Sequence, residues 1–202
     1  MKFIIGKKEV ILEKALNVLD EFAIKICRIL QNYFDYAIVG GYVAILFGRS
    51  RVTEDIDIIV SGEKLSIEYL SSFYDALLEK GFWIFNALKP EDGYEYLREG
   101  LSIRIAEKNT VIPNAELKIA MKRLDFVSLE EKIKVILNEN VLYLGSMELN
   151  IAYKFYLGSQ KDIEDAIHLY CLFKDVLDIS KLREYMKQLD VDYEAIRELL
   201  QC

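Results

Sequence analysis

Apolar positions repeat with the period of an α-helix over much of this chain. In the first such segment, residues 9–33, the apolar residues form one face of a long amphipathic helix. Further helices are predicted at 42–48 and 63–80, and a capping-box motif at 128–131 predicts a helix at 128–137. After Ser146 the pattern is helical throughout, and it predicts helices at about 147–157, 161–174, 179–189 and 192–200.

Short apolar or alternating runs predict the strands of a sheet. These runs occupy residues 36–40, 55–60, 82–85, 101–105, 115–120 and 141–144. Residues 88–99 are polar and contain Pro90 and Gly93, which predicts a loop. We therefore expect an α+β (α/β) protein in which helices flank a mixed β-sheet and a C-terminal helical segment follows. The predicted boundaries are 1–145 for the α/β domain and 146–202 for a helical extension packed on it.

Composition narrows the classes of protein that the chain can belong to. The 202 residues carry a net charge of −7, which argues against broad, nonspecific binding of nucleic acid. The N-terminal apolar run is too short for a signal peptide, and no segment approaches the roughly 18 apolar residues of a membrane span. The 3 cysteines are an odd number without metal-type spacing, which predicts reduced thiols. We expect a cytoplasmic protein with no membrane partner.

The most informative feature is a pair of aspartates in an otherwise apolar strand. Asp55 and Asp57 are two residues apart in the predicted strand 55–60, so both carboxylates leave the same face. Two like charges in apolar surroundings repel each other and lose solvation, so they need a compensating cation. Mg²⁺ favours oxygen ligands and often joins carboxylates to substrate phosphates, which makes it the first candidate.

Two consecutive glycines precede this strand at the junction between a strand and a helix. Gly40 and Gly41 suit a phosphate-binding turn, because glycine lets the backbone approach a ligand closely. A Gly-Gly pair in this position is also often only a tight connection. The nearby aspartate pair favours the phosphate-binding interpretation.

Together these residues resemble the signature of the DNA polymerase β nucleotidyltransferase superfamily. The matching pattern is Gly-Gly, thirteen residues, and then Asp-Ile-Asp in an apolar strand. The run 51–57 is similar to compact members, which include minimal nucleotidyltransferases and the nucleotidyltransferase toxins of abortive-infection toxin–antitoxin systems. A second block, 154–166, agrees, because those families often carry a lysine followed by a Lys/Arg-Asp-x-x-Asp run.

The resemblance implies a set of metal ligands. Asp55 and Asp57 would bind Mg²⁺ or Mn²⁺, and a third carboxylate would come from a neighbouring strand. Glu116 is the best match for it, and Asp125 is the second choice. As an alternative, Glu116 is a solvated strand residue.

It also implies contacts to a nucleoside triphosphate (NTP). Gly40 and Gly41 would shape the phosphate turn, and Arg51, Lys154 and Lys161 would supply positive charge. Asp162 would orient Lys161 or cap a helix. We expect the lysines to act on the triphosphate rather than on folding.

Other residues with chemical potential are better interpreted as structural. Arg49, Asp165 and His168 are interpreted as surface or packing residues, because charge patterns at helical spacing are common. The 13 tyrosines are scattered and fall mostly at helical core spacing, which indicates packing rather than base stacking.

Two functions remain open at this point. One is Mg²⁺-dependent transfer of a nucleoside monophosphate from an NTP to a hydroxyl on a protein, an RNA or a small molecule, with release of pyrophosphate. The other is a catalytically inactive nucleotide-binding or regulatory module of the same fold. The resemblance makes a toxin–antitoxin system, with an antitoxin or a neighbour-encoded protein as partner, a context for either.

Overall fold

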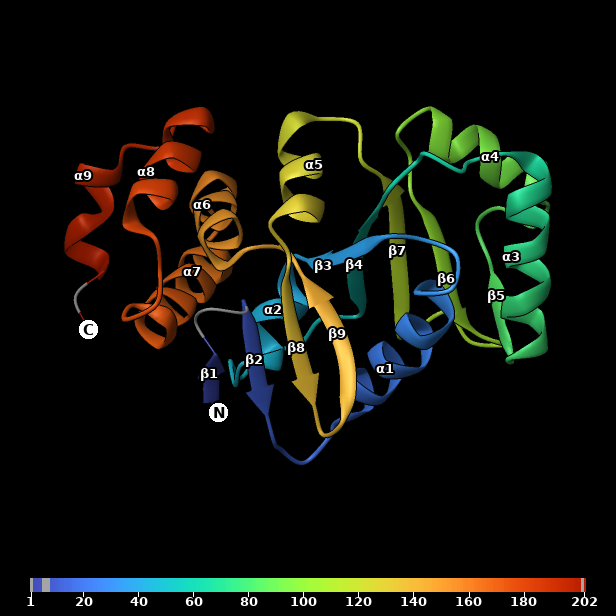
Figure 1. Cartoon of the computed structure of the whole chain (residues 1–202), viewed down its shortest axis with the longest axis horizontal. Coiled ribbons are helices and arrows are strands. Elements are labelled where there is room, and N and C mark those ends of the chain that lie inside the picture. Colours follow the sequence, from blue (N-terminus) through green and yellow to red (C-terminus); the bar gives the residue numbers. More distant parts are fainter. Residues whose placement is uncertain (1, 5–7, 201) are drawn as a thin grey trace.

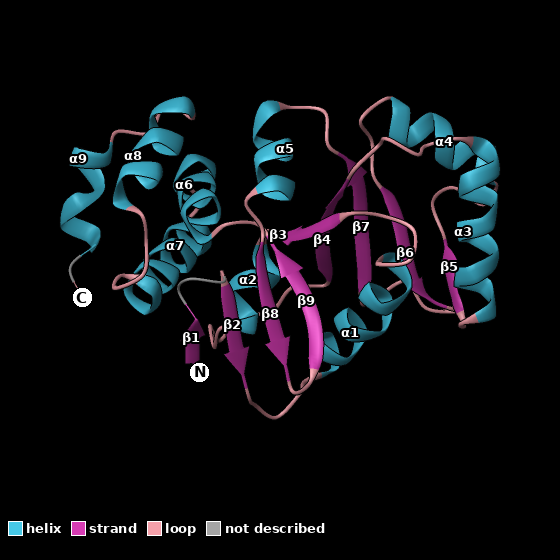
Figure 2. Ribbon diagram, in the orientation of Figure 1, coloured by secondary structure: helices cyan, strands magenta, loops and turns pink. Residues whose placement is uncertain are grey.

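The computed structural model describes residues 2–4, 8–200 and 202, and it shows a mixed sheet with helices on both faces (Figures 1 and 2). Within the described residues the sheet has nine strands in the spatial order β1-β2-β8-β9-β3-β4-β7-β6-β5. The strands are β1 (Lys2–Ile4), β2 (Glu9–Leu12), β3 (Tyr36–Val39), β4 (Asp55–Val60), β5 (Phe82–Ile84), β6 (Ile103–Glu107), β7 (Asn114–Ile119), β8 (Ile133–Leu137) and β9 (Asn140–Leu144). The α-helices are α1 (Val18–Leu30), α2 (Gly41–Leu46), α3 (Ile67–Glu79), α4 (Pro90–Arg98), α5 (Arg123–Glu130), α6 (Met147–Leu157), α7 (Gln160–Phe173), α8 (Ile179–Gln188) and α9 (Tyr193–Ile196).

Alternation along the central strands separates the two faces of the sheet. In β4, Ile56 and Ile58 belong to the main hydrophobic core, together with buried residues of α1, α2 and α3. Asp55, Asp57 and Ile59 are on the opposite face, because successive side chains of a strand alternate. On that face α5 lies against β3 and β4, and a smaller cluster forms from Ala37, Ile59, Ala120 and Leu129.

The C-terminal helices gather at one end of the molecule. Figure 1 shows α6 to α9 (orange to red) at the end opposite α3 and α4. Residues of α6, α7 and α8 share one core cluster with the sheet, for example Phe155, Leu169 and Leu182. The division of the chain into domains at residue 146 stays a prediction. None of the described helices is long and apolar enough to cross a membrane.

The mixed sheet, the flanking helices and the helical C-terminal segment are confirmed. Strand β4 coincides with its predicted range, and β3, β7 and β9 begin or end within one residue of theirs. Helices α2, α6 and α7 also fall where the apolar period predicts them. The pattern is reliable at these positions because each element buries one face or one stripe of apolar side chains.

Three predicted elements are wrong. The helix at 9–33 begins only at Val18, after the N-cap Asn17, and residues 9–12 instead form β2, which pairs in parallel with β8. The helix at 128–137 is split into the end of α5 and β8, since β8 forms an antiparallel hairpin with β9. The loop at 88–99 contains α4, whose first residue is Pro90, a position where the missing N–H costs no helical hydrogen bond. In the first two cases strand pairing overrides the local helical signal.

The prediction of reduced thiols is wrong for two of the three cysteines. Cys171 in α7 and Cys202 form a disulfide that closes a separation of 31 residues, with their Cα atoms 5.5 Å apart. Cys27 is a free, buried thiol. Spacing along the chain does not reveal this pair, because the packing of the C-terminal segment on α7 brings the two residues together. Residues 1 and 5–7 of the N-terminal apolar run lie outside the described part of the chain.

Candidate functional site

A cavity of about 360 Å³ opens on the face of the sheet that carries the aspartate pair. It lies between α5 and α6, over the ends of β3 and β4. Every residue predicted to bind metal or nucleotide lines this cavity except Glu116: Gly40, Gly41, Arg51, Asp55, Asp57, Lys154, Lys161 and Asp162. The tertiary structure therefore brings together residues from the two blocks of sequence, 40–57 and 154–162.

The Gly-Gly turn lies directly against one of the two aspartates. Gly40 is the N-cap of α2 and has φ +76° and ψ −146°, a conformation that is essentially restricted to glycine. A Cβ atom on Gly40 would lie 2.1 Å from Asp57 Oδ2. On Gly41 it would lie 3.0 Å from a guanidinium nitrogen of Arg51. Because α2 has only six residues, the main contribution of the glycines is room for the Asp57 and Arg51 side chains rather than a helix dipole.

The Asp57 carboxylate is placed where a negative charge is costly. Burial raises its pKa to about 6, and the negative charges of Asp55 and Glu116 act in the same direction. Lys118 and Lys154 lower the pKa by less. Within the described part of the chain, no hydrogen bond to the Asp57 carboxylate is found, whereas the Asp55 carboxylate accepts one from Thr53 Oγ1 at 2.9 Å.

This donor set fits a divalent metal ion. Asp55 and Asp57 offer carboxylate oxygens on one face of β4, and oxygen ligands are what Mg²⁺ and Mn²⁺ prefer. The missing side chain of Gly40 lets the Asp57 carboxylate lie directly against the turn. A bound cation would offset the burial and the repulsion that raise the pKa of Asp57. Among the described residues there is no group of three His, Cys, Asp or Glu side chains placed to hold a metal, so the site rests on the aspartate pair.

Glu116 lies beside Asp57 but is engaged elsewhere. It is directly opposite Asp57 in the parallel pairing of β4 and β7, and directly opposite Arg104 in the antiparallel pairing of β7 and β6. Its Oε1 forms an ion pair with the Arg104 guanidinium at 2.6 Å, and Ser102 Oγ donates to Oε2 at 3.4 Å.

The second choice for the third carboxylate, Asp125, is held by α5. It accepts hydrogen bonds from the backbone N–H groups of Met121 at 3.2 Å and Lys122 at 3.1 Å, and it forms an ion pair with Lys118 at 3.3 Å. These contacts give Asp125 a capping role at the start of the helix.

A buried network of charged side chains lies at the edge of the cavity and consists of Lys154, Asp162 and Asp165. Lys154 is only 3% exposed, and its Nζ atom lies 2.8 Å from Asp165 and 3.3 Å from Asp162. Arg51 extends this network, because its guanidinium forms an ion pair with the Asp165 carboxylate. The network joins α6 and α7 to the connector that leads into β4. A buried ion pair is costly to break from one side, so we expect Lys154 to contribute to stability as well, while its action on phosphate stays a prediction.

Lys161 differs from Lys154 in its surroundings. It is exposed, lines the cavity, and has no ion-pair partner among the described residues. Its charge is therefore available to a ligand. Asp162 accepts a hydrogen bond from the Ser159 hydroxyl, pairs with Lys154 and lies in the first turn of α7, whose N-cap is Ser159 rather than Asp162.

Sequence reasoning missed two residues of this region. Asp165 was interpreted as structural, yet it is fully buried and joins Arg51 to Lys154. Its spacing from Asp162, on the face of α7 that also buries Ala166 and Leu169, is the signal that could have identified it. Tyr153 was grouped with packing tyrosines, but it is 45% exposed and lines the cavity. His168 is a packed residue as expected, and its Nε2 lies 3.0 Å from the Phe47 carbonyl oxygen.

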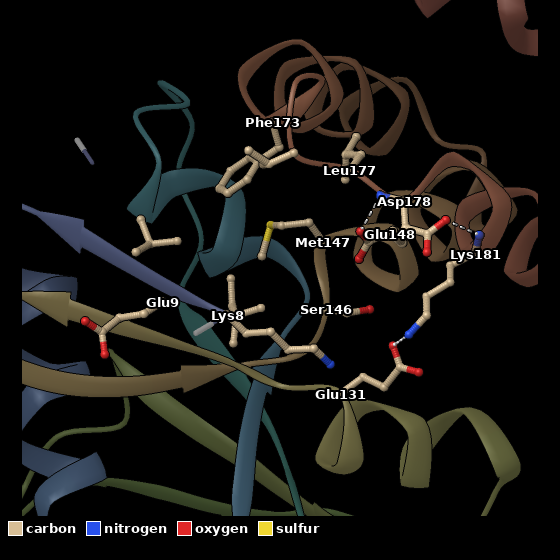
Figure 3. Close-up of a pocket in the computed structure, with 13 residues that line it drawn as sticks. Lys8, Glu9, Glu131, Ser146, Met147, Glu148, Phe173, Leu177, Asp178 and Lys181 are labelled. Atoms are coloured by element: carbon tan, nitrogen blue, oxygen red, sulfur yellow. Dashed lines mark hydrogen bonds and ion pairs between the residues drawn. The ribbon is translucent and has the colours of Figure 1, made fainter. Parts of the chain in front are cut away.

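A second cavity, of about 230 Å³, lies away from the aspartates between β2, β8 and the C-terminal helices (Figure 3). Its polar groups are bonded to one another. Lys181 donates to Glu131 at 2.5 Å, and Glu148 accepts a hydrogen bond from the backbone of Asp178 at 3.0 Å. Most of its charged side chains thus have partners within the protein.

Comparison with known proteins supports the fold. The sequence matches no protein-family model, and no curated protein is significantly similar to it. Solved structures do match. An antigenic nucleotidyltransferase-like protein from Paracoccidioides brasiliensis aligns with a TM-score of 0.56 and 18% identity over 89% of this chain and 90% of that one. The antibiotic-resistance factor ANT(2'')-Ia aligns with a TM-score of 0.52 and 14% identity over 88% of this chain and 96% of that one. This chain therefore has the fold of the nucleotidyltransferase-like proteins.

Proposed function

We propose that the chain is a divalent-metal-dependent nucleotidyltransferase that transfers a nucleoside monophosphate from an NTP to a hydroxyl group. In this reaction the acceptor oxygen forms a bond to the α-phosphorus and its proton leaves. The bond between the α-phosphorus and the oxygen bridging to the β-phosphate breaks, and pyrophosphate is released. The observation that carries the proposal is the position of Asp55 and Asp57 together in the cavity, with the Asp57 carboxylate directly against the Gly40 turn.

Asp55 and Asp57 would hold the metal ions, with Mg²⁺ or Mn²⁺ as the candidates. When bound, such ions neutralise the triphosphate and lower the pKa of the attacking hydroxyl. Glu116, opposite Asp57 in the adjacent strand, would complete the ligand set after leaving Arg104.

The remaining cavity residues would position the nucleotide. Gly40 and Gly41 line the cavity and would let the phosphates approach the backbone of the turn closely. Lys161 would supply a positive charge to the triphosphate, because no described residue pairs with it. Lys154 and Arg51, which pair with Asp162 and Asp165, would chiefly hold the walls of the cavity in place.

The acceptor is a hydroxyl of a protein, an RNA 3′ end or a small molecule. The net charge of −7 disfavours a large RNA, because nucleic-acid binding draws its affinity from positive charge. By resemblance to compact toxins of this superfamily, we also propose a toxin–antitoxin context with a neighbour-encoded partner, and action in the cytoplasm.

A second candidate is a nucleotide-binding module without transferase activity. The specific observation in its favour is the ion pair between Glu116 and Arg104, which engages the third carboxylate. A module of this kind would bind metal and NTP through the aspartate pair without transferring the nucleotide.

The test compares a double variant, Asp55→Asn with Asp57→Asn, with the matched control Asp75→Asn on an exposed part of α3. Calorimetric titration with Mg²⁺ and each NTP should show binding by the parent and the control but not by the double variant. Labelled NTPs incubated with cell lysate then report transfer without a guess about the acceptor. Unchanged metal-dependent NTP binding by the double variant would show that the site is elsewhere. If the parent binds NTP but labels nothing, even with its genomic neighbour's product present, the inactive-module function is favoured.

A further inference from the structure

One wall of the candidate cavity is apolar and partly exposed. Leu149, Tyr153 and Leu157 all line it from α6, and their spacing of four residues places them on one face of that helix. Leu124 lines the cavity from α5. Tyr153 is 45% exposed and Leu157 is 50% exposed, so the C-terminal part of this face is left uncovered by the protein itself, whereas Leu149 is buried.

The aromatic ring on this wall is supported by a second one. The rings of Tyr153 and Tyr156 lie with their centroids 5.6 Å apart. Tyrosine presents a large, flat contact area at a low cost in conformational entropy. The wall shares its cavity with Asp55, Asp57 and Lys161, which suit metal and phosphate. The ligand that matches both parts therefore has an anionic end and a flat, apolar end.

Two polar side chains beside this wall, Ser128 and Asn150, have their hydrogen-bond donors occupied. The Ser128 hydroxyl donates to the Leu124 carbonyl oxygen at 3.0 Å. The Asn150 amide nitrogen donates to the carbonyl oxygens of Gly145 and Ser146, both at 3.0 Å. The hydrogen-bond donors of these two side chains are thus used within the protein, and they are not free to read the edge of a base.

We propose that Tyr153 stacks on the nucleobase of the bound NTP, and that the site accepts all four NTPs with little discrimination. This inference rests on the proposed function, because the triphosphate fixes the orientation of the nucleotide in the cavity. Every base has a π-face, so stacking tolerates all of them. Strong rejection of a wrong base requires buried polar groups that are left unpaired by it, whereas an apolar wall discriminates weakly.

The experiment measures dissociation constants for ATP, GTP, CTP and UTP with Mn²⁺, and for inorganic triphosphate as a ligand without a base. Its variants are Tyr153→Ala, Tyr153→Phe and the control Tyr96→Ala, which alters an exposed tyrosine of α4 away from the cavity. We expect the four NTPs to bind the parent within about tenfold of one another. Tyr153→Ala should weaken all four by about 5- to 100-fold and leave inorganic triphosphate unchanged. Tyr153→Phe and Tyr96→Ala should bind like the parent, and all variants should melt like it.

Several results would overturn the inference. One NTP binding more than about 100-fold tighter than the others would show a base-reading contact. Loss of affinity in Tyr153→Phe would assign the effect to the hydroxyl rather than to stacking. Equal binding of NTPs and inorganic triphosphate by the parent would show that the base makes no contact. If metal-dependent triphosphate binding is intact in these cases, the proposed function survives. If neither NTP nor triphosphate binds the parent, both fail together.

Discussion

The Oδ2 atom of Asp57 lies 2.1 Å from the point that a Cβ atom on Gly40 would occupy. This close approach joins the turn after β3 to strand β4, whose residue Asp57 pairs with Val39 in register. The Asp57 carboxylate therefore occupies space that a side chain at position 40 would need, and only glycine is compatible with this arrangement.

Gly40→Ala should destabilise the protein and abolish metal binding. The substitution combines a strained positive φ of +76° with overlap on Asp57 Oδ2, and we expect a loss of about 3 kcal/mol or more in the free energy of unfolding. Gly81→Ala is the matched control, because Gly81 has φ +81° and nothing within 4 Å of its added Cβ. The free energy of unfolding of Gly81→Ala should fall by only about 1 kcal/mol, because only the strained backbone conformation contributes. Urea unfolding measures both, and equal losses would contradict a role for the Asp57 contact.

The metal-free protein should lose stability as pH rises through the titration of Asp57. Below pH 3.8, the ordinary pKa, the carboxyl is protonated in both the folded and the unfolded state and adds nothing. Between 3.8 and about 6 the unfolded state releases its proton first, so folding becomes less favourable, and above about 6 the penalty is complete. The penalty is at most about 3 kcal/mol.

Asp57→Asn tests this directly, because asparagine removes the charge at every pH. Its melting temperature should match that of the parent near pH 4 and exceed it near pH 7, in the presence of a chelator. A difference that does not vary with pH would show that the charge of Asp57 is not the cause.

Replacing Lys154 by alanine should chiefly lower stability, whereas replacing Lys161 by alanine should chiefly weaken NTP binding. Lys154→Ala leaves Asp162 and Asp165 with one cation fewer in a buried network, so unfolding should become easier by about 2–4 kcal/mol. Lys161→Ala removes an exposed charge and should leave the melting temperature unchanged while weakening NTP binding several-fold. Thermal melts and calorimetry on the same two proteins separate the effects. A stable Lys154→Ala with normal packing would show that the network is dispensable for folding.

Glu116→Gln should preserve Mg²⁺–NTP binding but lower transfer at least tenfold, which corresponds to about 1.4 kcal/mol of transition-state stabilisation. Arg104→Met tests the other partner of the ion pair. The pair is partly exposed, and such pairs contribute at most about 1 kcal/mol, so freeing Glu116 should tighten Mn²⁺ binding by no more than about fivefold. The gain should vanish in the double variant Arg104→Met with Glu116→Gln. Full transfer by Glu116→Gln would make Asp125 the candidate instead.

The disulfide between Cys171 and Cys202 should stabilise the protein by about 3–4 kcal/mol, because it closes a long loop in the unfolded chain. Reduction, or Cys171→Ser, should lower the melting temperature, and mass spectrometry of the unreduced protein should find the linked peptides.

Burial raises the pKa of the Cys27 thiol to about 12, so Cys27 should resist alkylation in the folded protein. Rapid labelling of more than one thiol without a reductant would contradict the pairing.

Local sequence identified the elements that bury one face. The run 55–60 is a strand whose apolar alternation makes its aspartates conspicuous, and the periodic segments after Ser146 are helices. The same local pattern failed at residues 9–12 and 133–137, which form strands because they pair with each other across more than 120 positions. A helical period carries no information about such pairing.

The candidate site divides in the same way. Asp55, Asp57, Gly40 and Gly41 could be read from the chain, because their chemistry is unusual for the positions they occupy. Their spatial relation to Lys154 and Lys161 depends on how α6 and α7 pack on the sheet. Only the tertiary structure decided that Lys154 is buried with Asp165, that Glu116 pairs with Arg104, and that Tyr153 faces the cavity. The physical reason is that burial and charge pairing belong to contacts between distant segments, whereas spacing and residue type are properties of one segment alone.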